Sequence, residues 1–271
     1  MKDHPLLTAF QHLKFKLVVA FKPRKNRTYT QFNRFLHQYE VLADKVLPFL
    51  VGDPAAAGTP PLEIILFGCS LGAEPYSLTS VLLHRFPHLK FRIRGFDIVP
   101  EVIAKAQGRE YNRDEVYNCP FITEEFVRLT FTITPAGLYR VRDEIASRVT
   151  FAVGNILDAG LFASLGQADL VFAQNMLFHL KPSLARVGFA NLTGLLKPRS
   201  ALLVDGMDTD MRIELTRKFN LEPVDYKVQE VHQDAFIDRG NDWASFYWGR
   251  EPFNTTDKDW LRKFGTVYLQ G

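Results

Sequence analysis

Five short apolar runs alternate with amphipathic stretches between residues 62 and 207. The apolar runs cover residues 62–68, 91–98, 149–156, 168–177 and 200–207. Stretches with apolar residues at helical spacing lie between them, at residues 73–86, 100–107 and 181–196. Pro100 stands at the first turn of the second of these stretches, a position that proline favours. Strands separated by helices predict an α/β fold built on a doubly wound, Rossmann-like parallel sheet.

The N-terminal part of the chain is predicted to be helical. Residues 4–22 and 32–50 show helical periodicity, and residues 51–61, with the sequence "VGDPAAAGTPP", form a linker rich in proline, glycine and alanine. We take this linker as a boundary. The sequence therefore predicts a short N-terminal helical cap over residues 1–60 and a main domain over residues 61–271.

Two stretches of the main domain break the alternation of strands and helices. Residues 109–149 indicate a helix followed by two short antiparallel strands. We interpret this segment as one small inserted α+β subdomain, that is, a small β-subdomain attached to the main sheet. Residues 211–271 are rich in aromatic side chains and predict antiparallel strands at the edge of the sheet.

Composition narrows the classes of partner. The 271 residues are 46% hydrophobic, and the net charge of +3 is too small to favour nucleic acid. Residues 1–34 carry eight Lys and Arg and one acidic residue. This excess of positive charge indicates either a basic face that binds an acidic partner or a solvated helix surface. The apolar stretch at the N-terminus is interrupted by charges and lacks a cleavage site, so we expect no signal peptide and no membrane insertion. Cys69 and Cys119 have no metal-binding spacing, which predicts reduced thiols in a cytoplasmic protein without a metal site.

The residues that could bind a ligand or take part in catalysis lie at the ends of the predicted strands, because ligands of open α/β sheets lie across the carboxyl ends of the strands. The first strand leads into "GCSLGAEPYS", in which Gly68 and Gly72 allow a ligand close to the backbone and to the N-terminus of the next helix. A tight strand–helix turn without a ligand would use the same glycines. Asp97 ends the second strand, where an acid binds a ribose diol or caps the helix that begins at Pro100.

Two further strand ends carry polar residues. The stretch "GNILD" places Asn155 and Asp158 where the edge of an adenine ring would lie. The stretch "QNMLFHL", residues 174–180, follows the fourth strand, where a reacting group would point. His179 in this stretch is either a residue that contacts the acceptor or a buried or capping residue.

Glu74 discriminates between cofactors. A carboxylate at the start of the helix predicted over residues 73–86 would repel a pyrophosphate. S-adenosylmethionine instead carries an ammonium and a sulfonium, which a nearby carboxylate attracts. The chain also lacks the dinucleotide motif GxGxxG. The charge at Glu74 therefore predicts S-adenosylmethionine as the cofactor, with S-adenosylhomocysteine as the product.

The motifs "GCSLGAEPYSL", "GFDIVPEVIAKAQGREY", "LYRVRDEIASRVTFAVGNILD" and "ADLVFAQNMLFHLKP" resemble, in this order, the CheR family. The resemblance covers about residues 28–206. It implies a class I methyltransferase fold and S-adenosylmethionine-dependent esterification of receptor glutamates in bacterial chemotaxis. It also implies that residues 109–149 correspond to the family's small β-subdomain, which holds a tethering peptide of the receptor in some members.

The resemblance also assigns site residues. The stretch "TQFNRF" is similar to a family motif whose Thr and Arg line the cofactor pocket, which implies this role for Thr30 and Arg34. The predicted catalytic residues are Arg34 and His179. The predicted cofactor-binding residues are Thr30, Arg34, Gly68, Ser70, Gly72, Glu74, Asp97, Asn155, Ile156 and Asn175.

The chain departs from the family pattern where the acceptor would bind. Gln174 replaces an Arg, His179 replaces a Tyr that is thought to lie near the transferred methyl group, and the last sixty residues match nothing in the family. Three functions therefore stay open. The first is a methyltransferase acting on a protein or peptide carboxylate, and the second acts on a small molecule with a hydroxyl, amine or carboxylate acceptor. The third is a catalytically silent module that binds the cofactor or its product.

Overall fold

The computed structural model describes residues 30–56, 58, 60–237 and 253–271, with the side chains of 235–237 excepted. The helix predicted over residues 4–22 lies outside the described residues, as does most of the basic stretch 1–34. Among the described residues, no helix combines the length and the apolar character that crossing a membrane requires.

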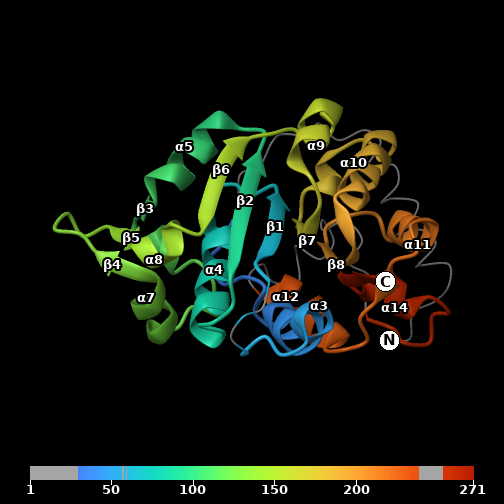
Figure 1. Cartoon of the computed structure of the whole chain (residues 1–271), viewed down its shortest axis with the longest axis horizontal. Coiled ribbons are helices and arrows are strands. Elements are labelled where there is room, and N and C mark those ends of the chain that lie inside the picture. Colours follow the sequence, from blue (N-terminus) through green and yellow to red (C-terminus); the bar gives the residue numbers. More distant parts are fainter. Residues whose placement is uncertain (1–29, 57, 59, 238–252) are drawn as a thin grey trace, which may run out of the picture.

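The central element is a seven-stranded sheet with the strand order β6-β2-β1-β7-β8-β10-β9. Its strands are β1 (Leu62–Phe67), β2 (Phe91–Asp97), β6 (Val149–Val153), β7 (Ala168–Ala173), β8 (Leu196–Val204), β9 (Glu222–Pro223) and β10 (Val267–Gln270). The first five strands in this order are parallel, whereas β10 runs antiparallel to β8 and β9 (Figure 1). The five predicted strands and the doubly wound sheet are confirmed, and β9 and β10 are the antiparallel edge strands predicted in the tail.

Helices cover both faces of this sheet because alternate strand residues face opposite sides. Ile64 and Leu66 of β1 contribute to a core shared with α4 and the N-terminal helices, whereas Ile65 and Phe67 contribute to a core shared with α10 and α11. The helices that follow strands are α4 (Ala73–Arg85), α5 (Pro100–Gly108), α9 (Ala159–Leu165), α10 (Pro182–Gly194) and α11 (Thr209–Lys218). Of these, the sequence analysis missed α9 and α11.

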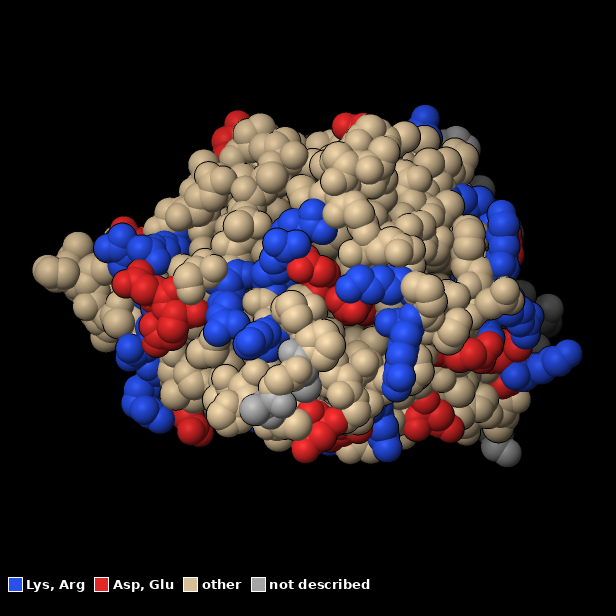
Figure 2. Space-filling model, in the orientation of Figure 1, with Lys and Arg blue, Asp and Glu red and all other residues tan. Residues whose placement is uncertain are grey.

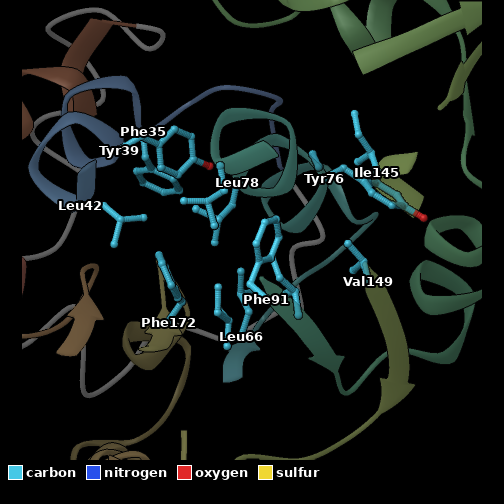
Figure 3. Close-up of a cluster of buried hydrophobic side chains, with 14 of the residues drawn as sticks. Phe35, Tyr39, Leu42, Leu66, Tyr76, Leu78, Phe91, Ile145, Val149 and Phe172 are labelled. Atoms are coloured by element: carbon cyan, nitrogen blue, oxygen red, sulfur yellow. The ribbon is translucent and has the colours of Figure 1, made fainter. Parts of the chain in front are cut away.

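The described N-terminal segment ends in one helical run. It consists of α2 (Leu36–Val41), a π-helical turn η1 (Leu42–Val46) and α3 (Leu47–Val51). Figure 3 shows Phe35, Tyr39 and Leu42 pointing toward Leu78 of α4 and Phe172 of β7. The helical spacing predicted over residues 32–50 thus reflects burial against the main sheet. The division at residue 60 into a cap and a main domain stays a prediction.

Residues 110–146 build a second, three-stranded antiparallel sheet with the order β3-β5-β4. It comprises β3 (Glu110–Tyr111), α6 (Arg113–Val116), α7 (Glu124–Thr130), β4 (Phe131–Ile133), β5 (Tyr139–Val141) and α8 (Asp143–Ala146). It projects beyond β6, at the left of Figure 1. The ring of Phe32 packs edge-on against Tyr111 and Phe131, with centroid distances of 4.9 and 5.1 Å. The helix and the two strands predicted here are present, and β3 is an additional strand.

The C-terminal segment returns to the N-terminal helices. Helix α12 (Val228–Ile237) contacts α2, and α14 (Trp260–Phe264) precedes β10. In Figure 1 the orange α12 lies beside the blue N-terminal helices, although the two are far apart in the sequence.

Candidate functional site

The loop between β1 and α4 follows a path that requires glycine. Gly68 and Gly72 have φ angles of 75° and 86°, in the left-handed region, and Ser70 has a φ of 48°. A Cβ atom on Gly72 would lie 3.0 Å from the Cβ of Ala106, and one on Gly68 would lie 3.1 Å from the Cβ of Met176. The loop therefore packs closely against α5 on one side and against the turn after β7 on the other.

Asp97 connects this loop to the end of β2. Its Oδ2 accepts a hydrogen bond from the backbone N–H of Ser70 at 2.9 Å, and its Oδ1 accepts one from the N–H of Val99 at 3.1 Å. Val99 is the N-cap residue of α5 and has no side-chain cap of its own. The acid thus stabilises the start of α5, as one interpretation of the sequence held, and it also orients the loop after β1. A carboxylate with two oxygens retains acceptor capacity for a diol.

Glu74 lies in the first turn of α4 and is 6% exposed. Its Oε1 has no hydrogen-bond partner in the described part of the chain. Burial raises the pKa of Glu74 to about 8, and the charge of Arg34 partly opposes this shift. A buried acceptor without a donor costs about 1–3 kcal/mol, so a cation placed beside Glu74 would relieve both the missing hydrogen bond and the raised pKa.

Tyr39 extends this region from α2. Its hydroxyl is buried and has no hydrogen-bond partner among the residues described. Burial raises the pKa of Tyr39 well above its usual value, and the charges of Glu74 and Cys119 add to the effect. In the sequence, Tyr39 falls on the apolar spacing of the helix predicted over residues 32–50, which indicates only a place in the core. No sequence signal distinguishes its hydroxyl from that of any other buried tyrosine.

The segment that carries Thr30 and Arg34 is held beside the start of α4. The N–H of Asn33 donates to Oγ of Ser77 at 2.8 Å, and its side-chain amide donates to the carbonyl of Phe121 at 2.9 Å. The carbonyl of Thr30 accepts a hydrogen bond from Asn118 at 3.5 Å. These contacts bring Arg34 to the side of α4 on which its charge lowers the pKa of Glu74.

The end of β7 carries Asn175 and His179. Asn175 has a φ of 52°, and its N–H donates to the carbonyl of Asp205 at 3.0 Å. His179 ends a short 3-10 helix, η2 (Leu177–His179), and its half-buried ring lies 4.1 Å from the ring of Phe178. A Cβ on Gly206 would lie 2.6 Å from the Cα of Asn175, so the turns after β7 and β8 are in close contact.

Two side chains in the stretch after β6 accept hydrogen bonds from the backbone that follows them. Oδ1 of Asn155 accepts from the N–H of Leu157 at 2.9 Å, and Ile156 is buried. Oδ1 of Asp158 accepts from the N–H groups of Gly160 and Leu161 and thus caps α9, and the place of Asp158 near an adenine edge stays a prediction. An acid directly before a helix satisfies the free N–H groups of its first turn, which explains this role.

Two exposed apolar residues extend the site and were missed by the sequence analysis. Ile98 follows Asp97 and is 51% exposed, and Val153 pairs with Asp97 from β6 and is 52% exposed. The end of the molecule at which the parallel strands finish, uppermost in Figures 1 and 2, shows few charged side chains. Ile98 continues the apolar run of β2 past the acid, and Val153 is the last residue of the apolar strand β6, so these strand ends were the available signal.

Comparisons with known proteins agree on one family. Residues 28–228 match the family model described as CheR methyltransferase, SAM binding domain. Chemotaxis protein methyltransferase 1 of Pseudomonas aeruginosa is 31% identical over 182 residues, which are 65% of this chain and 64% of that protein. The probable biofilm formation methyltransferase WspC of Pseudomonas putida is 33% identical over 150 residues, 55% of this chain and 34% of that protein. The match thus spans about two thirds of the first relative and one third of the second.

Among solved structures, an O-methyltransferase family protein from Burkholderia thailandensis aligns with a TM-score of 0.40 and 18% identity. This alignment covers 81% of this chain and 65% of that one.

Proposed function

The chain belongs to the CheR methyltransferase family, and from this premise we propose that it transfers a methyl group to a carboxylate oxygen of a protein or peptide glutamate. The matching region is the family's S-adenosylmethionine-binding domain, so S-adenosylmethionine is the cofactor. The names of the relatives, chemotaxis protein methyltransferase and biofilm formation methyltransferase, support a protein acceptor.

The observation that carries the proposal is the buried carboxyl of Glu74. A group with one unpartnered oxygen and a pKa raised to about 8 is suited to a cationic ligand and unsuited to a phosphate. The ammonium of S-adenosylmethionine meets this requirement. The residues present therefore fit the cofactor.

Other residues of the site match the remaining parts of the cofactor. Asp97 would accept hydrogen bonds from the ribose hydroxyls, and Ile98 and Val153 would contact the faces of the adenine ring. Asn155 and Ile156 follow β6 on the same side. Thr30, Arg34, Gly68, Ser70, Gly72 and Asn175 complete the proposed cofactor-binding set.

The chain's contribution to the reaction is mainly positioning. The bound cofactor supplies a methyl group attached to a positively charged sulfur. A glutamate acceptor is ionised at neutral pH and needs no base, so alignment of donor and acceptor provides most of the acceleration, about 7–11 kcal/mol in favourable systems. We assign Arg34 and His179 to orienting the acceptor carboxylate, since a guanidinium and an imidazolium both bind carboxylates.

A transfer assay tests this proposal through the chemistry of the product. The protein would be incubated with methyl-labelled S-adenosylmethionine and candidate acceptor proteins, and the labelled products would then be treated with mild alkali. A carboxyl methyl ester releases labelled methanol under these conditions, whereas a methyl ether or a methylamine does not. Asp97→Ala, which should weaken binding of the donor, serves as the negative control. Labelled product that resists alkali would contradict the carboxylate assignment.

A second candidate function is methylation of a small molecule through a hydroxyl or amine. The position of His179 directly after β7 favours this candidate, because a neutral imidazole removes a proton from such an acceptor. Alkali-stable product together with loss of activity in His179→Phe would support it.

A further inference from the structure

Helix α2 begins without a cap of its own. Phe35 occupies the N-cap position and makes no capping hydrogen bond. The N–H of His37, in the first turn, instead donates to Oδ2 of Asp234 at 3.1 Å, and Nδ1 of His37 lies 2.6 Å from Oδ1 of the same carboxylate. Asp234 belongs to α12, is 6% exposed and stands 197 residues away in the sequence. A carboxylate at this position satisfies a free N–H group and interacts favourably with the helix dipole.

A second contact reaches the next residue of α2. The side-chain amide of Gln38 donates to Oγ1 of Thr266 at 2.8 Å, and its carbonyl oxygen accepts from the amide of Gln174 at 2.7 Å. All three side chains are buried. Gln174 immediately precedes Asn175 at the end of β7. The chain Thr266–Gln38–Gln174 thus connects the segment before β10, the helix α2 and the strand end at the candidate site.

Each of these two contacts joins a residue inside the region that matches the family to a residue beyond it. Asp234 and Thr266 lie beyond residue 228, whereas His37 and Gln38 lie inside the match. The helix that they hold begins two residues after Arg34 and presents Tyr39 to α4 (Figure 3). Arg34 and Tyr39 are the two residues of this segment that interact electrostatically with Glu74.

We propose that Asp234 of α12 and Thr266 before β10 are positioning residues for the methyl-donor site, which hold α2 in place beside α4 and the end of β7. This inference rests on the function proposed above. The first part of the segment that carries Arg34 and Tyr39 is held by Asn33, which donates hydrogen bonds to Ser77 of α4 and to Phe121 before α7. The second part of this segment is held by Asp234 and Thr266.

The physical consequence is a change in apparent affinity. When a contact that holds α2 is lost, the population of the arrangement that binds the donor falls, and the apparent dissociation constant rises by the same factor. A lost N-cap or an unsatisfied buried amide shifts this equilibrium by about 3- to 30-fold, and the dissociation constant rises by the full factor where the other arrangement becomes the majority. A residue that only supports global stability would leave the affinity of the folded protein unchanged.

The test uses S-adenosylhomocysteine as the probe and calorimetry on the full chain. Asp234→Ala should raise the dissociation constant about 5- to 10-fold. Thr266→Val, which keeps the shape but leaves the Gln38 amide unsatisfied, should raise it about 3- to 10-fold. The conservative variants Asp234→Asn and Thr266→Ser keep an acceptor in place, so they should recover most of the affinity.

A matched control removes a different contact to α2, made by a residue just before α12. Lys227 pairs with Glu40 of α2 at 2.6 Å on the surface, and Lys227→Gln should change the dissociation constant less than twofold. Thermal unfolding and hydrogen exchange of the α2 amides, measured on each variant, report whether the variant is folded and whether α2 has loosened.

The outcomes separate this inference from the proposed function. If the wild type binds the probe and both Asp234→Ala and Thr266→Val bind it equally well, the inference is wrong and the proposed function stands. If the wild type does not bind the probe at all, both are wrong. Weaker binding that the conservative variants restore, with the Lys227→Gln control unchanged, supports the inference. Should Asp234→Ala fail to fold, the Thr266 pair alone decides.

Discussion

The carboxylate of Asp97 and the backbone N–H of Ser70 are joined by a 2.9 Å hydrogen bond across the ends of β2 and β1. This bond orients the glycine-containing loop with the same side chain that we assign to the ribose. The cofactor site is therefore partly assembled before a ligand arrives, and a change at Asp97 should affect both the loop and the ligand.

Replacing Asp97 with Ala should weaken the binding of S-adenosylhomocysteine by about 1.5–3 kcal/mol, the range for hydrogen bonds to a charged group. Calorimetry measures this change. Asp208→Ala is the matched control, because Asp208 also caps a helix after a strand but is assigned no ligand contact. Equal effects of the two substitutions on affinity would mean that Asp97 acts only as a cap.

The raised pKa of Glu74 predicts how the stability of the cofactor-free protein depends on pH. Between about pH 5 and 8 the folded state retains the Glu74 proton, whereas the unfolded state has lost it. The unfolded state binds fewer protons in this range, so the free energy of unfolding should fall as pH rises, in total by a few kcal/mol at most. Denaturant titrations at several pH values measure this slope. Glu74→Gln should abolish the part that Glu74 contributes, and an unchanged slope would contradict the assignment.

The same carboxyl predicts proton release on cofactor binding. A neighbouring ammonium favours ionised Glu74, so binding below about pH 8 should release a proton, and the affinity should increase as pH rises from 6 toward 8. Calorimetry at one pH in two buffers with different ionisation heats counts the protons released. Glu74→Gln should release fewer protons and should bind about 1.5–3 kcal/mol more weakly.

Gly72→Ala should destabilise the protein by about 1–3 kcal/mol and weaken cofactor binding. The φ of 86° is unfavourable for alanine, and the added Cβ would contact Ala106 and the ring of Phe151. The control is Gly108→Ala, since nothing lies within 4 Å of a Cβ at Gly108. That substitution should be neutral or stabilising by up to about 1 kcal/mol. Thermal unfolding and calorimetry on both variants check the difference.

His179→Phe should reduce methyl transfer while changing the affinity for S-adenosylhomocysteine less than about twofold, an estimate that rests on assigning this side chain to the acceptor. The pH profile of the wild type identifies the acceptor class. With a carboxylate acceptor held by a protonated His179, the rate should fall as pH rises through the range in which imidazoles titrate, about 6–7. A hydroxyl or amine acceptor reverses the slope. Full activity and an unchanged profile in the variant would make His179 a structural residue.

The sequence by itself determined the five parallel strands, the loop after β1 and the cofactor. These depend on local information: the alternation of apolar runs with helical spacing, glycines at 68 and 72, and the sign of the charge at Glu74. The helices α9 and α11 were missed because α9 has only seven residues and α11 is largely polar, so neither shows a strong apolar stripe. The cap that Asp158 provides to α9 was not predicted, because an acid before a helix and an acid at a ligand leave the same local pattern.

Only the tertiary structure decided which residues hold this site together. The contacts between His37 and Asp234 and between Gln38 and Thr266 join residues 197 and 228 positions apart, and neither pair has a local sequence pattern. The raised pKa of Glu74 likewise depends on burial, which arises only when the chain packs. Periodicity and motif chemistry act over a few residues, whereas burial and hydrogen-bond partners arise when distant segments pack. The sequence therefore predicted the groups that would meet the cofactor, and the packing of distant segments determined the contacts around those groups.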